Sequence, residues 1–225
     1  MIVPDIIERT NRKTLSLSVM KDGAVIVKAP ISMQESVINR FVAEKQNWIK
    51  EKLLIVNKTN DKFEEVINYK SFLLYGNKYG LVLADVKKIE INDNFQIVLP
   101  NKTEPDKILK TMKSWYKKAA KKILQDRLKF VEERIKLKSN SMKISDSKGR
   151  WGSCNTRGII AFNWRVIMLP PQIIDYVIVH ELCHLVEMNH SKKFWGLVQR
   201  FLPNYANLKK AIKEYGFALS LFRDK

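Results

Sequence analysis

The sequence predicts an α+β protein in two parts, a small α+β unit over residues 1–100 and a second domain over residues 101–225. Short apolar runs with the two-residue alternation of strands come first, helical periodicity dominates later, and the change falls near Pro100. The chain has 225 residues, of which 45% are hydrophobic, so it is long enough to bury a core of its own.

The first part combines short strands with one helix. Asp22-Gly23 is a turn-forming pair between two alternating runs, which is typical of a β-hairpin. Apolar residues recur at helical spacing from Ser36 to Val56, and we expect this helix to pack on the sheet. The predicted strands lie at residues 15–19, 24–27, 81–83 and 95–99.

The second part begins with a long amphipathic helix after Pro105, whose apolar residues fall on one stripe as far as Ile135. Two strands follow, Arg150 to Cys154 and Ile159 to Asn163, and a turn-rich tetrapeptide joins them. Pro170 and Pro171 then open another helix, because proline is tolerated in a first turn.

This last helix carries an H-E-x-x-H motif, formed by His180, Glu181 and His184. Residues four apart on a helix lie on one face, about 6 Å apart along the axis, so the two imidazoles can converge on one metal ion. Glu181 is displaced around the helix, where its carboxylate can reach a water on the metal. The motif predicts a metal-dependent hydrolase with Glu181 as the general base, and it outweighs the alternative of two core histidines on a buried helix.

A third ligand is expected at His190, so all three histidines of the chain would bind one metal. On an unbroken helix His190 would lie about 15 Å from His180 along the axis, so the chain must turn after about Met188. Asn189 is a candidate left-handed stop and Ser191 a candidate N-cap of a new helix. Glu214 is the alternative ligand; Glu187 lies too near His184 in the chain.

Three histidines leave a fourth coordination position for water, which predicts one catalytic zinc ion per chain and disfavours a closed structural zinc site. The cysteines, Cys154 and Cys183, are too few for a disulfide scaffold and indicate a reducing compartment. No export signal or membrane span is evident, so we expect a cytoplasmic protein with no membrane partner. The sequence makes no prediction of oligomeric state.

The formal net charge is +18, from 41 Lys and Arg against 23 Asp and Glu. From Lys107 to Lys138 there are twelve basic residues against three acidic ones, with Trp115 and Tyr116 among them. Non-specific binding of nucleic acid or nucleotides through this basic surface is one interpretation. A solvated face on a core helix is the favoured one, because the apolar spacing accounts for both aromatic residues.

Three segments carry a family resemblance: R-W-G-S-C, then G-I-I-A-F-N-W-R, then the run from Ile174 through the histidines to Trp195. They resemble the YgjP-like family of predicted metal-dependent hydrolases, which is similar to SprT-like zinc metalloproteases. Trp48-Ile49 and the Y-G-N-K-Y string that begins at Tyr75 also look like that family's N-terminal region. The resemblance implies a zincin-like catalytic domain in which His180, His184 and His190 bind the metal.

The leading functional prediction is a zinc metallopeptidase that acts on a peptide or protein substrate, using a zinc-bound water activated by Glu181. We expect the strand from Ile159 to Asn163 to align the substrate as an edge strand. Two alternatives stay open: a metal-dependent nucleotide phosphohydrolase, and a nucleic-acid-binding module with a vestigial metal site. Arg150 and Trp151 are candidate substrate contacts that the sequence leaves undecided.

Overall fold

The structure is a computed structural model, and it describes residues 2–20 and 22–222. The chain forms two compact units, Met1–Glu64 and Glu65–Lys225, each described by itself below. Both units combine helices with a small sheet or sheets, which confirms the predicted α+β class. Among the described helices, none joins the length to the apolar character that crossing a bilayer requires.

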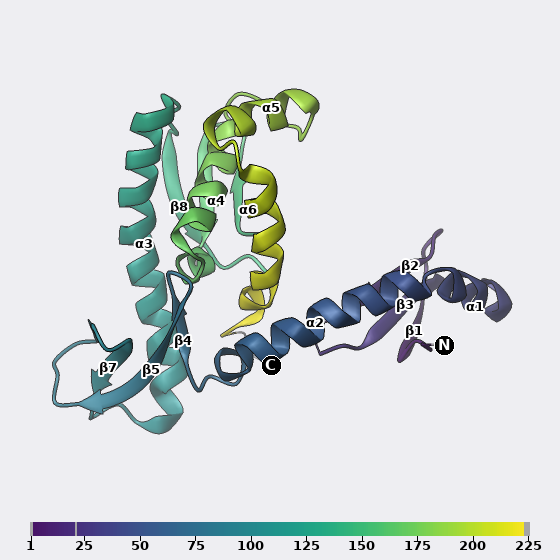
Figure 1. Ribbon diagram of the computed structural model, residues 1–225, viewed down its shortest axis with the longest axis horizontal. Coiled ribbons are helices and arrows are strands. Elements are labelled where there is room, and N and C mark those ends of the chain that lie inside the picture. Colours follow the sequence, from purple (N-terminus) through teal and green to yellow (C-terminus); the bar gives the residue numbers. More distant parts are fainter. Residues whose placement is uncertain (1, 21, 223–225) are drawn as a thin grey trace. The chain divides into compact units, whose positions relative to one another are not determined.

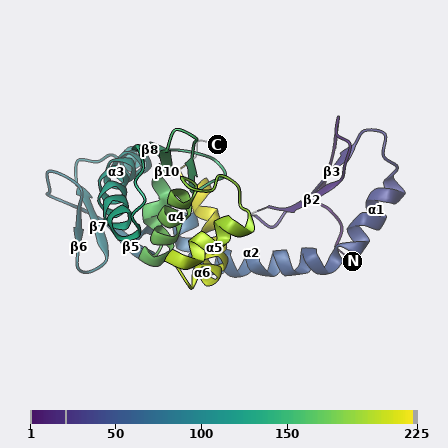
Figure 2. The same ribbon diagram turned by 90° about the horizontal axis from the view of Figure 1, so that it is seen from above.

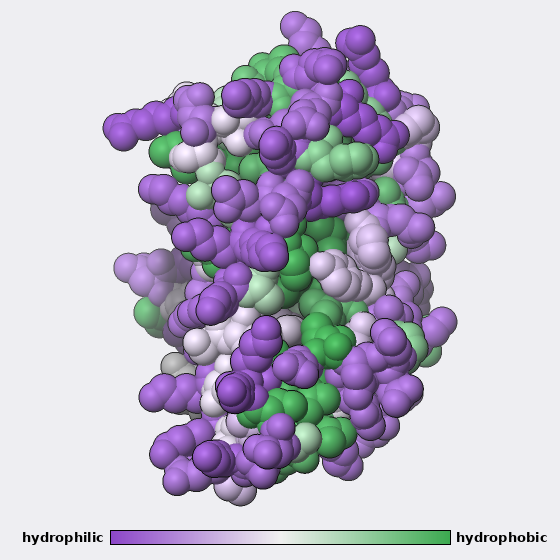
Figure 3. All heavy atoms as spheres, turned by 90° about the vertical axis from the view of Figure 1, so that its left-hand side faces the viewer, coloured by the Kyte–Doolittle hydropathy of each residue, from purple (hydrophilic) through white to green (hydrophobic). Residues whose placement is uncertain are grey.

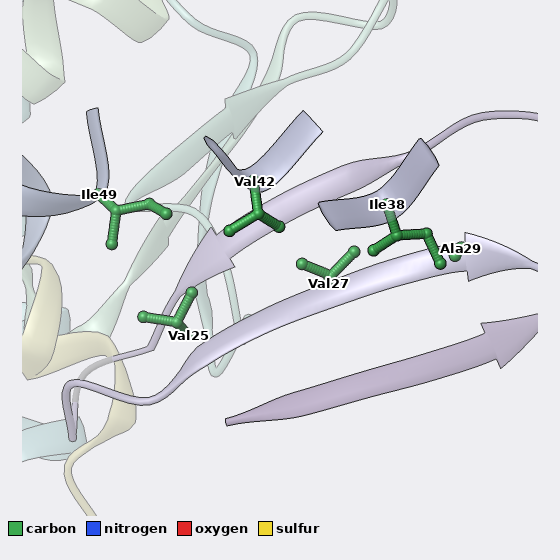
Figure 4. Packing of buried hydrophobic residues seen from close by; sticks show 6 residues of the cluster. All are labelled: Val25, Val27, Ala29, Ile38, Val42 and Ile49. Carbon is green, nitrogen blue, oxygen red and sulfur yellow. The ribbon is translucent and has the colours of Figure 1, made fainter. Parts of the chain in front are cut away.

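The first unit is a three-stranded sheet covered by helices. Strand β3 lies in the centre, parallel to β1 and antiparallel to β2. Because side chains alternate along a strand, Val25, Val27 and Ala29 of β3 all face the helices. Figure 4 shows them beside Ile38, Val42 and Ile49, with which they form a buried core. The elements are β1 (Ile6–Thr10), β2 (Ser16–Val19), β3 (Val25–Pro30), α1 (Glu35–Glu44) and α2 (Gln46–Ile67).

The single helix predicted from Ser36 to Val56 is wrong in one respect, because the chain breaks between α1 and α2. Lys45 leaves helical geometry, with φ −97° and ψ 8°. The side-chain amide of Gln46 then pairs with the backbone of Ile2, donating to its carbonyl at 2.8 Å and accepting from its N–H at 2.7 Å. This non-local pairing at the break has no counterpart in the helical periodicity. Beyond it, α2 runs as the long helix of Figure 2 until its geometry breaks at Phe63, with φ −120° and ψ 18°, close to the end of the first unit at Glu64.

The second unit contains two sheets and a group of helices. The first sheet has the order β4-β5-β7-β6, and the second has the order β8-β10-β9. In Figure 1, α4 lies between α3 and α6, and α4 contacts both. The strands are β4 (Phe72–Leu74), β5 (Asn77–Ala84), β6 (Glu90–Asn92), β7 (Gln96–Pro100), β8 (Ser141–Ser145), β9 (Gly152–Cys154) and β10 (Ile159–Asn163). The helices are η1 (Pro105–Lys107), α3 (Ile108–Ile135), η2 (Trp164–Met168), α4 (Pro171–Cys183), α5 (Lys192–Phe201), α6 (Tyr205–Ala211) and η3 (Ile212–Ser220).

The division of the structure after Glu64 differs from the boundary predicted at residue 100. The turn between β4 and β5 packs on η2 and the start of α4: the N–H groups of Tyr75 and Gly76 donate to η2 carbonyls at 2.9 and 3.0 Å. Gly76 has φ +82°, and a Cβ there would lie 2.7 Å from Pro170. The sheet of residues 72–100 therefore shares a compact unit with the H-E-x-x-H helix. These contacts join segments about ninety residues apart, so local pattern could not predict them.

Helix α3 has the predicted amphipathic character. Its buried stripe includes Tyr116, which is fully buried and donates through its hydroxyl to the carbonyl of Leu73 at 2.7 Å. Trp115 packs edge-on against Tyr116, with ring centroids 5.0 Å apart. Figure 3 views the side on which α3 lies and shows mostly hydrophilic side chains there. The exposed basic residues of α3 are Lys110, Lys118, Lys121, Lys122, Lys129 and Arg134. The aromatic residues belong largely to the packing of the helix, which favours the solvated-face interpretation.

Candidate active site

Helix α4 delivers the H-E-x-x-H motif from inside the second unit. Nine of its thirteen residues are buried, as expected for a helix that is apolar on most sides. Pro171 occupies its first turn, where the missing N–H costs no helical hydrogen bond. Glu181 and His184 are buried at 5% and 8% exposure, and His180 is half-buried. Packing of the surrounding apolar residues therefore holds the motif in place.

The three histidines form a compact triangle. Their ring centroids are 4.8 to 5.0 Å apart, and one ligand atom from each ring lies within 4.8 Å of the others. The Nε2 atoms of His180 and His190 are 3.0 Å apart. Two nitrogens bound to one tetrahedral zinc ion are separated by roughly 3.3 Å, so the arrangement fits zinc after a small adjustment. Glu187 and Glu214, the other residues considered from the sequence, are not part of this cluster.

The chain returns His190 to the motif by a route that differs from the predicted one. The helix ends at Cys183 instead of continuing to about Met188, and Asn189 does not adopt a left-handed conformation. The N–H groups of Leu185 and Val186 instead donate to carbonyls three residues back, which tightens the chain into turns. The expected start of the next helix is confirmed, since Ser191 accepts a hydrogen bond from the N–H of Phe194 at 3.3 Å.

The imidazole rings are oriented by their surroundings. His184 Nδ1 lies 3.1 Å from the carbonyl of Glu187; a carbonyl can only accept, so Nδ1 is the donor and Nε2 is the ring nitrogen left for a metal. Phe194 is fully buried and contacts all three rings, with centroids 4.5 to 4.9 Å away. Trp195 stacks on His190 with ring centroids 5.6 Å apart. Helix α5 thus supplies an aromatic support for the three rings.

Burial and neighbouring positive charge lower the pKa values of His180 and His190, which favours the neutral imidazole, the form that binds metals. Burial lowers the pKa of His180 to about 3, and His184, His190 and Lys209 add to the effect. The pKa of His190 is also lowered, first by burial and then by His184 and Lys209. Protons therefore compete weakly for the nitrogens of these two histidines at neutral pH.

Glu181 lies next to the triangle in a restricted space. Burial raises the pKa of its carboxyl group to about 8, and the positive charge of Arg150 acts in the opposite direction. A Cβ atom on Gly152 would lie 2.6 Å from Glu181 Oε1 and 2.8 Å from its Cδ. Glycine is therefore required here so that β9 can approach the carboxylate closely.

A cavity of about 460 Å³ connects the histidines, Glu181 and β9. Its lining residues are Arg150, Trp151, Gly152, Ser153, Cys154, Tyr176, Val177, His180, Glu181, His184, Met188, His190 and Ile212. Both candidate substrate contacts, Arg150 and Trp151, are among them. Cys183 is fully buried in the core, whereas Cys154 is half-buried and lines the cavity.

The strand expected to align a substrate was wrongly chosen. Residues 159–163 form β10, which pairs with β8 on one side and β9 on the other, so its backbone groups are already used. The edge strand at the cavity is β9. The Asn163 N–H donates to the Trp151 carbonyl at 2.7 Å, so by the alternation of antiparallel pairing the backbone groups of Gly152 and Cys154 point to the free edge.

A comparison with protein families supplies the identification. The family model described as YgjP-like, metallopeptidase domain, matches residues 13–215. The chain belongs to the YgjP-like family. This confirms the family predicted from the sequence and identifies the chain as carrying a metallopeptidase domain. No curated protein matches the chain significantly.

Among solved structures, the chain is similar to the crystal structure of the metallopeptidase zymogen of Pyrococcus abyssi abylysin. The two share 21% identity with a TM-score of 0.38, over 41% of this chain and 93% of that chain.

Sequence reasoning missed several of the residues that line the cavity. Gly152, Tyr176 and Ile212 line it without having been predicted to do so. The R-W-G-S-C string was a usable signal, since a glycine inside a strand often marks a close approach of backbone to another group. Ile212 lies in an apolar C-terminal segment, and nothing in its local sequence indicates a cavity.

Proposed function

We propose that this chain is a zinc-dependent peptidase in which His180, His184 and His190 hold one metal ion and Glu181 is the general base. The observation that carries the proposal is the convergence of the three imidazoles and one buried carboxylate on a single cavity beside an edge strand. Three neutral nitrogen ligands with an open fourth position are typical of catalytic zinc sites. Bound there, zinc would polarise the scissile carbonyl and increase the acidity of water.

Glu181 takes a proton from the attacking water and passes it to the leaving amine. Its location suits both transfers, because it is beside the histidines and at the same time in close approach to β9. Burial raises the pKa of this carboxyl group to about 8, and a dication on the histidines would favour the ionised form, which is the form a base requires. The protein therefore supplies a base whose proton affinity depends on metal loading.

The edge of β9 is the proposed substrate platform. An extended peptide that pairs with the free backbone groups of Gly152 and Cys154 becomes an additional strand of the β8-β10-β9 sheet. Because Gly152 adjoins Glu181, the scissile bond of such a peptide would lie next to the base. Backbone pairing is independent of side chains, so it fits a protein or peptide substrate better than a nucleotide.

The alternative of a nucleotide phosphohydrolase receives less support. Phosphoryl transfer usually uses magnesium held by carboxylates and substrate phosphates. Glu181 is the one carboxylate among the residues that line the cavity. A histidine-lined site with a single carboxylate matches carbonyl hydrolysis more closely.

The test compares the wild type with Glu181→Gln on a peptide library, with zinc content measured on the same preparations. The amide keeps the size of the side chain but cannot take a proton, so turnover should fall by roughly two to four orders of magnitude while zinc is retained. Glu133→Gln makes the same change at an exposed site on α3 and should leave turnover unaltered. Unchanged turnover in zinc-loaded Glu181→Gln would refute the proposal, and loss of zinc would instead make Glu181 a ligand or structural residue.

A further inference from the structure

Arg150 is an exposed cation that lines the cavity two residues before β9. Its main chain is held in place, because its carbonyl accepts a hydrogen bond from the side chain of Asn163 at 3.3 Å. Its guanidinium, in contrast, takes part in none of the ion pairs of the described residues. The residue therefore combines a positioned backbone with a charged group that is available to a ligand.

The exposed charge in the lining of the cavity is positive, because Arg150 is exposed. Glu181 is the one acidic residue in its lining, and it is buried. Besides Arg150, Lys209 is a nearby cation, since its Nζ lies 3.7 Å from the ring centroid of Trp195, which stacks on His190. A divalent ion on the histidines would add to this excess. The cavity therefore favours a substrate with negative charge near the reacting bond.

The position of Arg150 along the sheet defines where that charge would lie. Arg150 lies two residues before the first residue of β9, and two residues of extended chain span at most about 7 Å, so its backbone lies within that distance of Gly152. A peptide paired with β9, with its scissile bond beside Glu181, would bring a side chain one or two residues away within reach of the guanidinium. An arginine binds a carboxylate through two parallel hydrogen bonds, which gives selectivity as well as affinity.

We propose that Arg150 is a specificity-determining residue that binds a substrate carboxylate one or two residues from the scissile bond. This inference rests on the proposed peptidase function and names its substrate class: peptides that are acidic next to the cleavage site. The carboxylate can belong to an Asp or Glu side chain or to the C-terminus of a short peptide. Both offer the same two oxygens to the guanidinium.

The test uses matched peptides based on a sequence that the wild type cleaves. The peptides of a pair differ by Glu or Gln at one of the two residues before or the two residues after the cleaved bond. Every peptide is made both with a free C-terminus and with an amidated C-terminus. Loss of a charge-assisted bidentate contact should lower kcat/KM for the acidic peptide roughly 10- to 100-fold in Arg150→Gln, with little change for the neutral peptide. Arg157→Gln, an exposed arginine on the turn between β9 and β10, is the matched control and should keep the preference.

Binding provides a second readout that does not depend on turnover. In the Glu181→Gln background, calorimetry should show tighter binding of the acidic peptide, and adding Arg150→Gln should abolish the difference. If tighter binding depends on a free C-terminus and not on an acidic side chain, the carboxylate that Arg150 binds is the C-terminal one. This result supports the same role for Arg150. Arg150→Lys should restore part of the preference, because it returns the charge without the planar fork.

The outcomes separate this inference from the function on which it rests. If the wild type cleaves no peptide in the library, the proposed function itself fails. If the wild type cleaves peptides without an acidic preference, or if Arg150→Gln keeps that preference, the specificity role is refuted while the peptidase stands. An equal loss of kcat/KM for acidic and neutral peptides also refutes it, since Arg150 would then act through Glu181 or the transition state.

Discussion

Gly152→Ala tests how closely the edge strand approaches Glu181. The added Cβ would lie 2.6, 2.7 and 2.8 Å from Oε1, Cγ and Cδ of Glu181, whereas ordinary van der Waals contact begins at 3.4 Å. The shortfall is roughly 0.7 Å, so either the carboxylate or the strand must move by a comparable distance. Glu181 is 5% exposed, and the free space next to it is the cavity that it lines, so relieving the clash moves the carboxylate away from its position beside β9 or moves the strand away from the helix.

The expected loss follows from this displacement. A misplacement of about 1 Å can lower a rate about 100-fold, so we expect kcat/KM to fall roughly 10- to 100-fold, which corresponds to about 1.4 to 2.7 kcal/mol of transition-state stabilisation. Zinc retention should change little, because the contacts involve Glu181 and not the histidines. Overpacking costs about 1 to 3 kcal/mol, and the lower entropy of the unfolded alanine chain offsets part of it, so the protein should remain folded.

The assay measures kcat/KM on the best cleaved peptide, zinc content and Tm for the wild type, Gly152→Ala and Gly80→Ala. Gly80 is also a strand glycine, in β5, but a Cβ there meets no atom within 4 Å, so its replacement should leave activity unaltered. Activity of folded, zinc-loaded Gly152→Ala within about twofold of the wild type would contradict the close approach. A drop of equal size in both variants would point to general destabilisation instead.

Three further predictions follow from the described contacts. His190→Ala should weaken zinc binding at least about 100-fold in a chelator competition assay, whereas Glu214→Ala should not, and the reverse result would assign the third ligand to Glu214. Partial burial disfavours ionisation of Asp146, but hydrogen bonds from Arg165, Lys117 and Trp164 hold the pKa of its carboxyl group well below the usual range. The ionised carboxylate therefore stabilises the folded protein fully above the unfolded pKa of about 3.9, and this stabilisation declines as the pH falls below that value. Arg165 is fully buried and Asp146 is 38% exposed, so Asp146→Asn should lower the free energy of unfolding by about 2 kcal/mol at pH 7 and by less at pH 3, as measured by urea unfolding. An equal loss at the two pH values would refute this pH dependence. Any binding of duplex DNA to the exposed lysines of α3 should be independent of sequence and fall steeply with salt in fluorescence anisotropy, and its absence at low salt would leave these lysines as a solvated surface.

The sequence determined the features that depend on helix periodicity and local capping. The four-residue spacing of His180 and His184 places both on one face of any helix, and Ser191 begins α5 through a bond to an N–H three residues ahead. The amphipathic stripe of α3 is equally local. These features depend only on the types of residues and on their spacing along the chain.

Only the tertiary structure decided how segments distant in sequence meet. The alternating pattern of residues 159–163 predicts a strand, but it does not say whether that strand has one neighbour or two, and here β8 and β9 flank it on both sides. The close approach of Gly152 to Glu181 joins a strand to a helix about thirty residues later. Hydrogen bonds from the β4–β5 turn to η2 likewise place residues 72–100 with the H-E-x-x-H helix. Such pairings depend on which backbone groups and apolar faces remain unsatisfied after the local elements form, and that is a property of the whole chain.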